Sequence, residues 1–140
     1  MYARTEQEGT VSGQVNRSYT TVPYSGTMKD ALDRMVGDGN NVAVVMDQDH
    51  LVGVVTVADI VHLAAEGTDL SNTSIRTHME ACTLSGAQPC IQVREDENLE
   101  NVLKAMQHSG QNEVLVVTAE NKVVGTLRAL DVLKGWKKGV

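Results

Sequence analysis

The segment Leu51-Val-Gly-Val-Val-Thr-Val-Ala-Asp-Ile60 returns later in the chain as Val123-Val-Gly-Thr-Leu-Arg-Ala-Leu-Asp-Val132. In both copies a glycine stands among apolar residues, and an aspartate follows it six positions later. The β-branched first half is typical of a strand, and the apolar spacing of the second half favours the start of a helix. The sequence therefore predicts, twice, a strand that leads directly into a helix.

The segments upstream of the two copies repeat as well. Residues 27–35 match residues 98–106, and the apolar run 42–46 matches residues 113–117. The register shifts by one residue in the polar turn that follows each run, where insertions are tolerated because the backbone is solvated. The chain thus contains two copies of one unit of roughly sixty residues.

Each copy is predicted to be a β-α-β-β-α unit. Thr27 and Asn98 are good N-caps for its first helix, and Gly39 and Gly110 suit the end of that helix. The remaining expected elements are an extended piece at 20–22 or 90–93, a hairpin of 42–46 with 51–55 or 114–117 with 122–127, and a second helix at 57–66 or 129–137.

These elements predict an α/β (α+β) fold. A sheet of this size cannot bury both faces alone, so we expect the two repeats to pack sheet to sheet with pseudo-twofold symmetry. Two equivalent clefts between the repeats would follow, and such clefts are common ligand sites. The expected organisation is a tail at 1–9, repeat 1 at 10–66, a linker at 67–73 and repeat 2 at 74–140.

Composition excludes several classes of protein. The chain has 140 residues, 3% aromatic residues and no Phe, which predicts an aliphatic core. Its net charge of −6 and its scattered basic residues argue against nucleic acid as a partner. Residues 1–9 are polar and no apolar run reaches membrane-spanning length, so we expect no membrane or export segment and a cytoplasmic location.

Neither the cysteines nor the four histidines form a catalytic or metal-binding pattern. Seven residues separate Cys82 from Cys90 around the predicted turn 86–89, and we interpret the two as reduced thiols rather than as a redox or metal pair. The histidines are scattered, without a nearby acid and nucleophile. The sequence therefore predicts no enzyme activity, no metal site and no required cofactor.

The repeated motif has a structural and a functional interpretation. Thr56 and Asp59 approximate a capping box, in which each side chain accepts a hydrogen bond from the backbone of the other residue. The same helix start offers free N–H groups to a phosphate, and a carboxylate there can accept both hydroxyls of a ribose. Arg128 cannot cap a helix as Thr56 does, yet Asp131 is present, so this aspartate is a candidate for a role beyond capping.

The tandem Gly-h-h-Thr-x-x-Asp-h pattern, where h is an apolar residue, resembles the paired cystathionine-β-synthase (CBS) domains. The resemblance extends from about Val11 to Lys137, with matching helices upstream of both motifs. It implies an α/β pair that often dimerises through its helices into a flat disk. It also implies binding of an adenosine-containing ligand such as AMP, ADP, ATP, S-adenosylmethionine or NADH.

Carried onto this sequence, the resemblance assigns Asp59 to the ribose hydroxyls and Thr56 to ribose or phosphate in the first cleft. In the family the adenine side of a cleft tends to come from the other repeat. This implies Cys90, Ile91 and Asn112 near the first site, although ordinary packing explains each of them equally well.

In the second cleft the resemblance assigns Asp131 and Arg128 to these roles, with Tyr19, Thr20 and Asn41 on the adenine side. Arg128 departs from the usual Ser or Thr of the family. Either it occludes the cleft or pairs with a carboxylate, which we favour, or its guanidinium holds a phosphate. Glu113 is a second departure, because some relatives have a basic residue there. A carboxylate would repel phosphates, which favours a weakly charged adenosine ligand at the first site.

Two functions remain open on these grounds. The favoured one is a regulatory module that senses an adenosine-containing ligand, forms a homodimer and signals to an effector protein that is not part of this chain. The alternative is a structural dimerisation or scaffold module whose clefts are filled by its own side chains.

Overall fold

The computed structural model describes residues 10–82, 90–120 and 122–138, and the expectations for residues 1–9 and 86–89 lie outside this part of the chain. The described residues form a mixed α+β fold with one four-stranded and one three-stranded sheet, which confirms the predicted class. The chain divides into two compact units, Ser18–Thr83 and Met1–Arg17 with Leu84–Val140. We describe each unit by itself.

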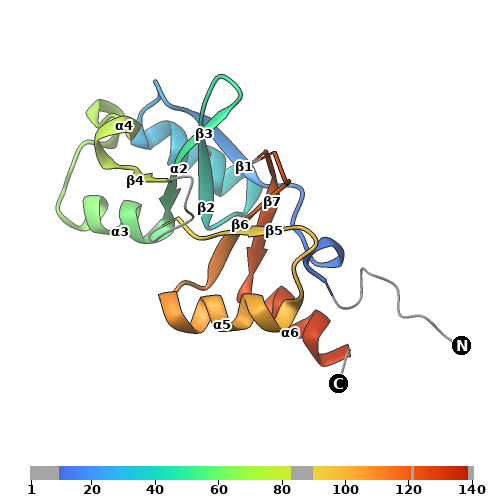
Figure 1. Ribbon diagram of the computed structural model, residues 1–140. Coiled ribbons are helices and arrows are strands. Elements are labelled where there is room, and N and C mark those ends of the chain that lie inside the picture. Colours follow the sequence, from blue (N-terminus) through green and yellow to red (C-terminus); the bar gives the residue numbers. More distant parts are fainter. Residues whose placement is uncertain (1–9, 83–89, 121, 139–140) are drawn as a thin grey trace, which may run out of the picture. The chain divides into compact units, whose positions relative to one another are not determined.

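The first unit, Ser18–Thr83, contains the predicted β-α-β-β-α order (Figure 1). Its strands pair in the order β1-β2-β3-β4, with β1 parallel to β2 and the other pairs antiparallel. The elements are β1 (Thr20–Pro23), α2 (Met28–Asp38), β2 (Val42–Asp47), β3 (His50–Thr56), α3 (Val57–Ala65), η2 (Leu70–Asn72), α4 (Ile75–His78) and β4 (Glu80–Ala81).

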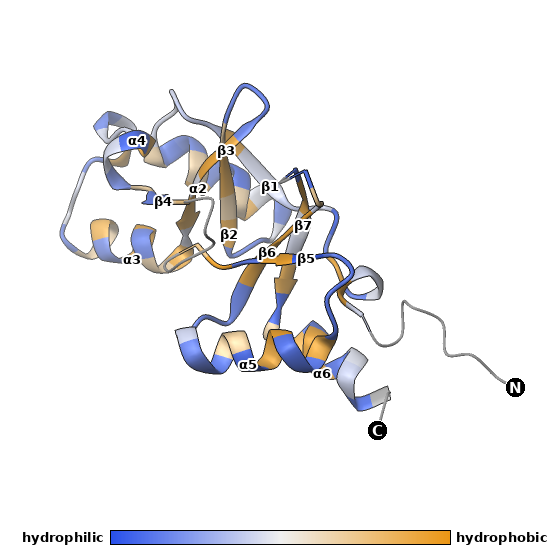
Figure 2. Ribbon diagram, in the orientation of Figure 1, coloured by the Kyte–Doolittle hydropathy of each residue, from blue (hydrophilic) through white to orange (hydrophobic). Residues whose placement is uncertain are grey.

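The core of this unit is aliphatic, as the composition predicts. Alternate residues of the central strands, among them Val45 and Val55, are fully buried with residues of α2 and α3. Apolar residues follow β2 and β3 along their lengths (Figure 2). The helix residues in this cluster are Met28, Ala31, Met35, Ile60 and Leu63, and their helical spacing is the reason that one face of each helix is buried.

The second unit repeats this plan. Strands pair in the order β5-β6-β7, and α5 and α6 lie side by side (Figure 1). Its elements are η1 (Val11–Gly13), β5 (Gln92–Arg94), α5 (Leu99–Ser109), β6 (Glu113–Val117), β7 (Val123–Arg128) and α6 (Ala129–Lys138). Val11, from the start of the described chain, belongs to the same buried cluster as Met106 and Leu127.

The first residues of each predicted repeat complete the compact unit that contains the other repeat. β4 pairs with β3 opposite Gly53, where an added Cβ would lie 2.8 Å from the carbonyl oxygen of Glu80. In the other unit Asn16 bridges to Thr126, and a Cβ on Gly125 would press against the carbonyl oxygen of Asn16. The repeated glycine is therefore required by the close approach of a fourth extended segment.

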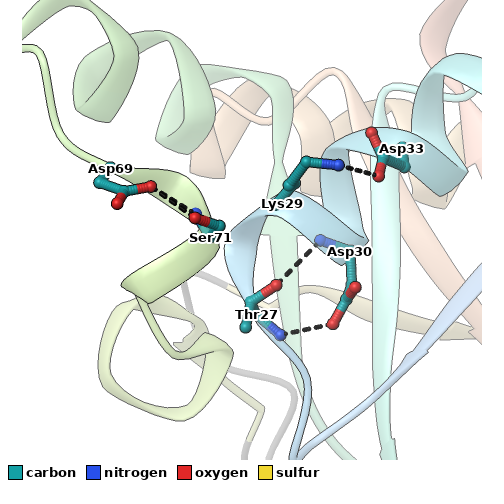
Figure 3. Close-up of polar contacts among 6 residues, drawn as sticks. All are labelled: Thr27, Lys29, Asp30, Asp33, Asp69 and Ser71. Carbon is teal, nitrogen blue, oxygen red and sulfur yellow. Dashed lines mark hydrogen bonds and ion pairs between the residues drawn. The ribbon is translucent and has the colours of Figure 1, made fainter.

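The first helix of each repeat begins and ends as predicted. The Thr27 hydroxyl accepts from the N–H of Asp30 at 3.1 Å, and the Asp30 carboxylate accepts from the N–H of Thr27 at 2.8 Å (Figure 3). Asn98 caps α5 through the N–H of Asn101. Gly39 and Gly110 end the two helices in the left-handed conformation, at φ 71° and 73°.

Two features of the segment after α3 differ from expectation. The predicted linker, residues 67–73, contains the short helix η2, and α4 and β4 follow it at the start of the predicted second repeat, where the sequence indicates no such elements. These elements are too short for a periodic signal, and pairing with β3 stabilises β4. Cys82 and Cys90 are both disulfide-bonded, so the expectation of reduced thiols is wrong. Spacing could not exclude a bond, because closing a short loop costs little chain entropy.

Candidate functional site

The start of α3 holds the pair of residues that the motif singles out. The Thr56 hydroxyl accepts from the N–H of Asp59 at 3.3 Å, and Asp59 Oδ2 accepts from the N–H of Thr56 at 2.8 Å. The hydroxyl of Thr56 also donates to Asp59 Oδ2 at 3.0 Å. The structural interpretation is thus confirmed, since the two residues form a complete capping box.

The capping box leaves part of the Asp59 carboxylate available. All of its hydrogen bonds within the described residues are made by Oδ2, and Oδ1 has none. The side chain is half-buried, which removes part of the competition from water. Such an oxygen, fixed in place at the positive end of a helix dipole, can accept hydrogen bonds from a bound hydroxyl.

The equivalent position in the second unit is arranged differently. Arg128 Nε donates to Asp131 Oδ2 at 2.8 Å, and this hydrogen bond raises the pKa of the Arg128 guanidinium. The expectation that Arg128 forms a salt bridge is therefore confirmed. Because the guanidinium neutralises much of the charge of the Asp131 carboxylate, this carboxylate is a weaker acceptor for a ribose hydroxyl.

Glu113 lies beside this ion pair. It stands opposite Arg128 in the β6–β7 ladder. Burial raises the pKa of its carboxyl group, while a hydrogen bond with Thr126 and the charge of Arg128 act in the other direction. In the second unit, two carboxylates thus act on one guanidinium. Their negative charges neutralise most of the positive charge that could hold a phosphate.

Two of the residues expected near adenine have polar atoms that are occupied within the chain. The Thr20 side chain is buried, and its hydroxyl donates to Asp38 Oδ2 at 2.7 Å. Cys90 is buried and disulfide-bonded. Both side chains thus have partners within the chain, and the placement of these residues near adenine stays a prediction.

The other residues expected near adenine are partly or fully exposed. The carbonyl of Asn41 accepts from the N–H of Val57 at 2.9 Å, and that of Asn112 accepts from the N–H of Ala129 at 2.8 Å. Each asparagine therefore lies at the start of the second helix of its own repeat. Ile91 packs against the core of the second unit, and Tyr19 is half-buried. Their placement near adenine stays a prediction.

Glu80 is a site residue that the sequence does not reveal. It lies on β4 opposite Val54, two positions before Thr56. Burial, and in smaller part the charge of Asp59, raises the pKa of its carboxyl group. A two-residue strand carries no periodic pattern, so only the β3–β4 register brings this carboxylate to the Thr56–Asp59 pair.

Residues 10–82, 90–120 and 122–138 contain no cluster of three or more His, Cys, Asp or Glu side chains that could hold a metal ion. Over the same residues, every helix is too short or too polar to cross a bilayer.

Comparison with known proteins identifies both repeats. The family model described as CBS domain matches residues 11–66 and 87–138. An uncharacterised protein of Methanocaldococcus jannaschii is 27% identical over 124 residues, which cover 89% of this chain and 43% of that protein. The chain therefore spans less than half the length of this relative.

Solved structures share the fold at low sequence identity. A CBS domain protein from Pyrobaculum aerophilum complexed with AMP superposes with a TM-score of 0.75 and 20% identity, over 87% of this chain and 88% of that one. The cytosolic domain of the Mg²⁺ channel MgtE in complex with ATP gives a TM-score of 0.72 and 22% identity, over 91% of this chain and 48% of that one. At these identities the likeness shows the fold alone.

Proposed function

Since this chain belongs to the CBS domain family, we propose that it is a regulatory module that binds an adenosine-containing ligand at the start of α3. In this proposal Asp59 accepts hydrogen bonds from the ribose hydroxyls, and Thr56 contacts ribose or phosphate. Ligand binding favours one arrangement of the module over another and so changes its interaction with an effector protein.

The observation that carries the proposal is the available oxygen of Asp59. The capping box fixes the carboxylate through Oδ2 and leaves Oδ1 without a hydrogen bond in the described chain. A positioned, half-buried acceptor is suited to the vicinal hydroxyls of a ribose, because little conformational freedom is lost on binding. The AMP and ATP complexes of proteins with the same fold agree in ligand class.

The second motif contributes less to binding in this proposal. Arg128 contacts the motif's aspartate at 2.8 Å and neutralises much of its charge, so this carboxylate is a weaker acceptor for a ribose hydroxyl than that of Asp59. We therefore assign the main adenosine site to Thr56 and Asp59.

Ligand titration tests the proposal. The melting temperature of the protein is measured with AMP, ADP, ATP, NADH and S-adenosylmethionine, and each hit is followed by calorimetry. A ligand that binds only the native state raises stability by an amount that grows with its concentration, by about 2.7 kcal/mol at a hundredfold excess over Kd. If none of these compounds changes the melting temperature, a scaffold module without a nucleotide is the better description.

Homodimerisation in the cytoplasm is part of the same proposal. Large apolar side chains are exposed on the second helix of each repeat, including Val61 at 62% on α3 and Leu130 at 64% on α6. Trp136, also on α6, is 42% exposed. Apolar and aromatic side chains in these positions are suited to burial against a second copy of the chain.

A further inference from the structure

Resting on the proposed function, we propose that the Thr56–Asp59 site selects adenosine compounds whose 5′ substituent carries no negative charge, and that Glu80 sets this selectivity. The preferred ligand class is adenosine with a neutral or cationic 5′ group, such as a sulfonium. Nucleoside phosphates are the disfavoured class.

The position of Glu80 follows from the strand register. Glu80 pairs with Val54 across β3 and β4, and Thr56 follows Val54 by two residues. Since alternate residues of a strand point to the same face, the side chains of Glu80 and Thr56 emerge on one face of the sheet. The backbone of β4 is held close to β3 because Gly53 has no side chain, as a Cβ there would lie 2.8 Å from the Glu80 carbonyl oxygen.

The interaction between the two carboxylates supports this placement. Asp59 raises the pKa of Glu80, in addition to the larger effect of burial. Their charges are therefore close enough to interact, and Glu80 is only half-exposed, so water screens them incompletely. The roughly half charge of a helix N-terminus does not offset two carboxylates.

The cations of the same unit are engaged elsewhere. Ser18–Thr83 contains nine Asp and Glu residues but only three Lys and Arg residues. Lys29 pairs with Asp33, Arg34 donates to the carbonyl of Thr21, and Arg76 lies over the ring of Tyr24. Within this unit, a phosphate at the start of α3 would meet two carboxylates without a counter-charge, whereas a neutral or cationic group meets no such repulsion.

Calorimetry with four probes tests the selectivity: adenosine, S-adenosylmethionine, AMP and ATP, each at low ionic strength. Binding at the site in question is defined as the component that Asp59→Ala removes. For this component we expect AMP to bind at least about tenfold more weakly than adenosine, and ATP more weakly still. Glu80→Gln should reduce the ratio of the Kd of AMP to the Kd of adenosine by about threefold or more. Added salt should reduce the same ratio in the parent protein.

Asp49→Asn is the matched control. It removes one negative charge from the exposed turn before β3, while Thr56 ends that strand, about 20 Å away at the rise of an extended chain. This variant should leave the ratio of the Kd of AMP to the Kd of adenosine unchanged. Melting curves of both variants confirm that the fold is intact before affinities are compared.

The outcomes separate this inference from the proposed function. If AMP binds as tightly as adenosine and Glu80→Gln changes nothing, the selectivity is refuted while an adenosine site stands. If Asp49→Asn narrows the ratio as much as Glu80→Gln, general charge rather than Glu80 is responsible, and the assignment of Glu80 fails. If no probe binds, the proposed function itself is overturned, and the selectivity with it.

Discussion

At the scale of single residues, a capping box and a ligand site use the same atoms. Thr27 with Asp30 and Thr56 with Asp59 have nearly the same hydrogen bonds at the starts of α2 and α3. They differ in surroundings, because Asp30 is exposed while Asp59 is half-buried and close to Glu80. The pair on α2 therefore serves as an internal reference for what capping alone contributes.

Asp59→Ala should weaken binding of the adenosine ligand by at least about tenfold, because the acceptor of the ribose hydroxyls is removed. It should also cost roughly 0.5–2 kcal/mol of stability through the lost cap. Calorimetry measures the first effect and denaturant unfolding the second.

Asp30→Ala is the control for that experiment, since it removes the corresponding carboxylate from the other capping box. A similar loss of stability with unchanged affinity is expected. Equal affinities of the Asp59→Ala variant and the parent protein would refute the assignment of Asp59 to the ribose.

At the scale of elements, the glycine of each motif serves packing rather than a turn. Gly53 and Gly125 both lie within strands, at the point where another extended segment approaches. The repeated glycine thus marks an edge at which β3 or β7 accepts a fourth segment. In the first unit this approach also positions Glu80, so a packing requirement and the chemistry of the site are linked.

Gly125→Ala should destabilise the protein by about 1–3 kcal/mol, because the new Cβ would press against the backbone of Asn16, which cannot rotate away as a side chain can. Gly37→Ala is the matched control: a Cβ there has nothing within 4 Å, and alanine favours a helix. Urea unfolding of both variants measures the difference. A loss of stability no larger than that of Gly37→Ala would contradict the packing role.

At the scale of the whole molecule, the compact units do not follow the sequence repeats. Val11 packs in the unit of the second repeat, and Ile75 packs in the unit of the first. The core of each unit therefore includes a residue from the start of the other repeat. Cutting the chain between the repeats would thus remove part of each core.

The exposed apolar residues of α3 and α6 lead to a prediction about assembly. Val61→Asp combined with Leu130→Asp should convert a dimer into monomers, because two charges per chain would become buried in the interface. Light scattering after size exclusion should then give a mass near 15.1 kDa instead of twice that value.

Val36→Asp on α2 is the control for assembly, since Val36 is 72% exposed on the first helix of its repeat. This variant should remain dimeric. If the parent protein is itself monomeric, or if Val36→Asp is as effective as the double variant, the proposed interface on α3 and α6 is wrong.

The sequence alone determined the two β-α-β-β-α repeats, their helix ends and the pair of Thr56 and Asp59, because these depend on local periodicity and on contacts between residues three or four apart. Only the tertiary structure placed Glu80 on the strand next to β3 and packed the leading segment of each repeat in the unit of the other repeat. Those features depend on strand register and on contacts between distant segments, which leave no periodic signal in the sequence. The disulfide-bonded state of Cys82 and Cys90 belongs to the same group, since their spacing in the chain does not determine it.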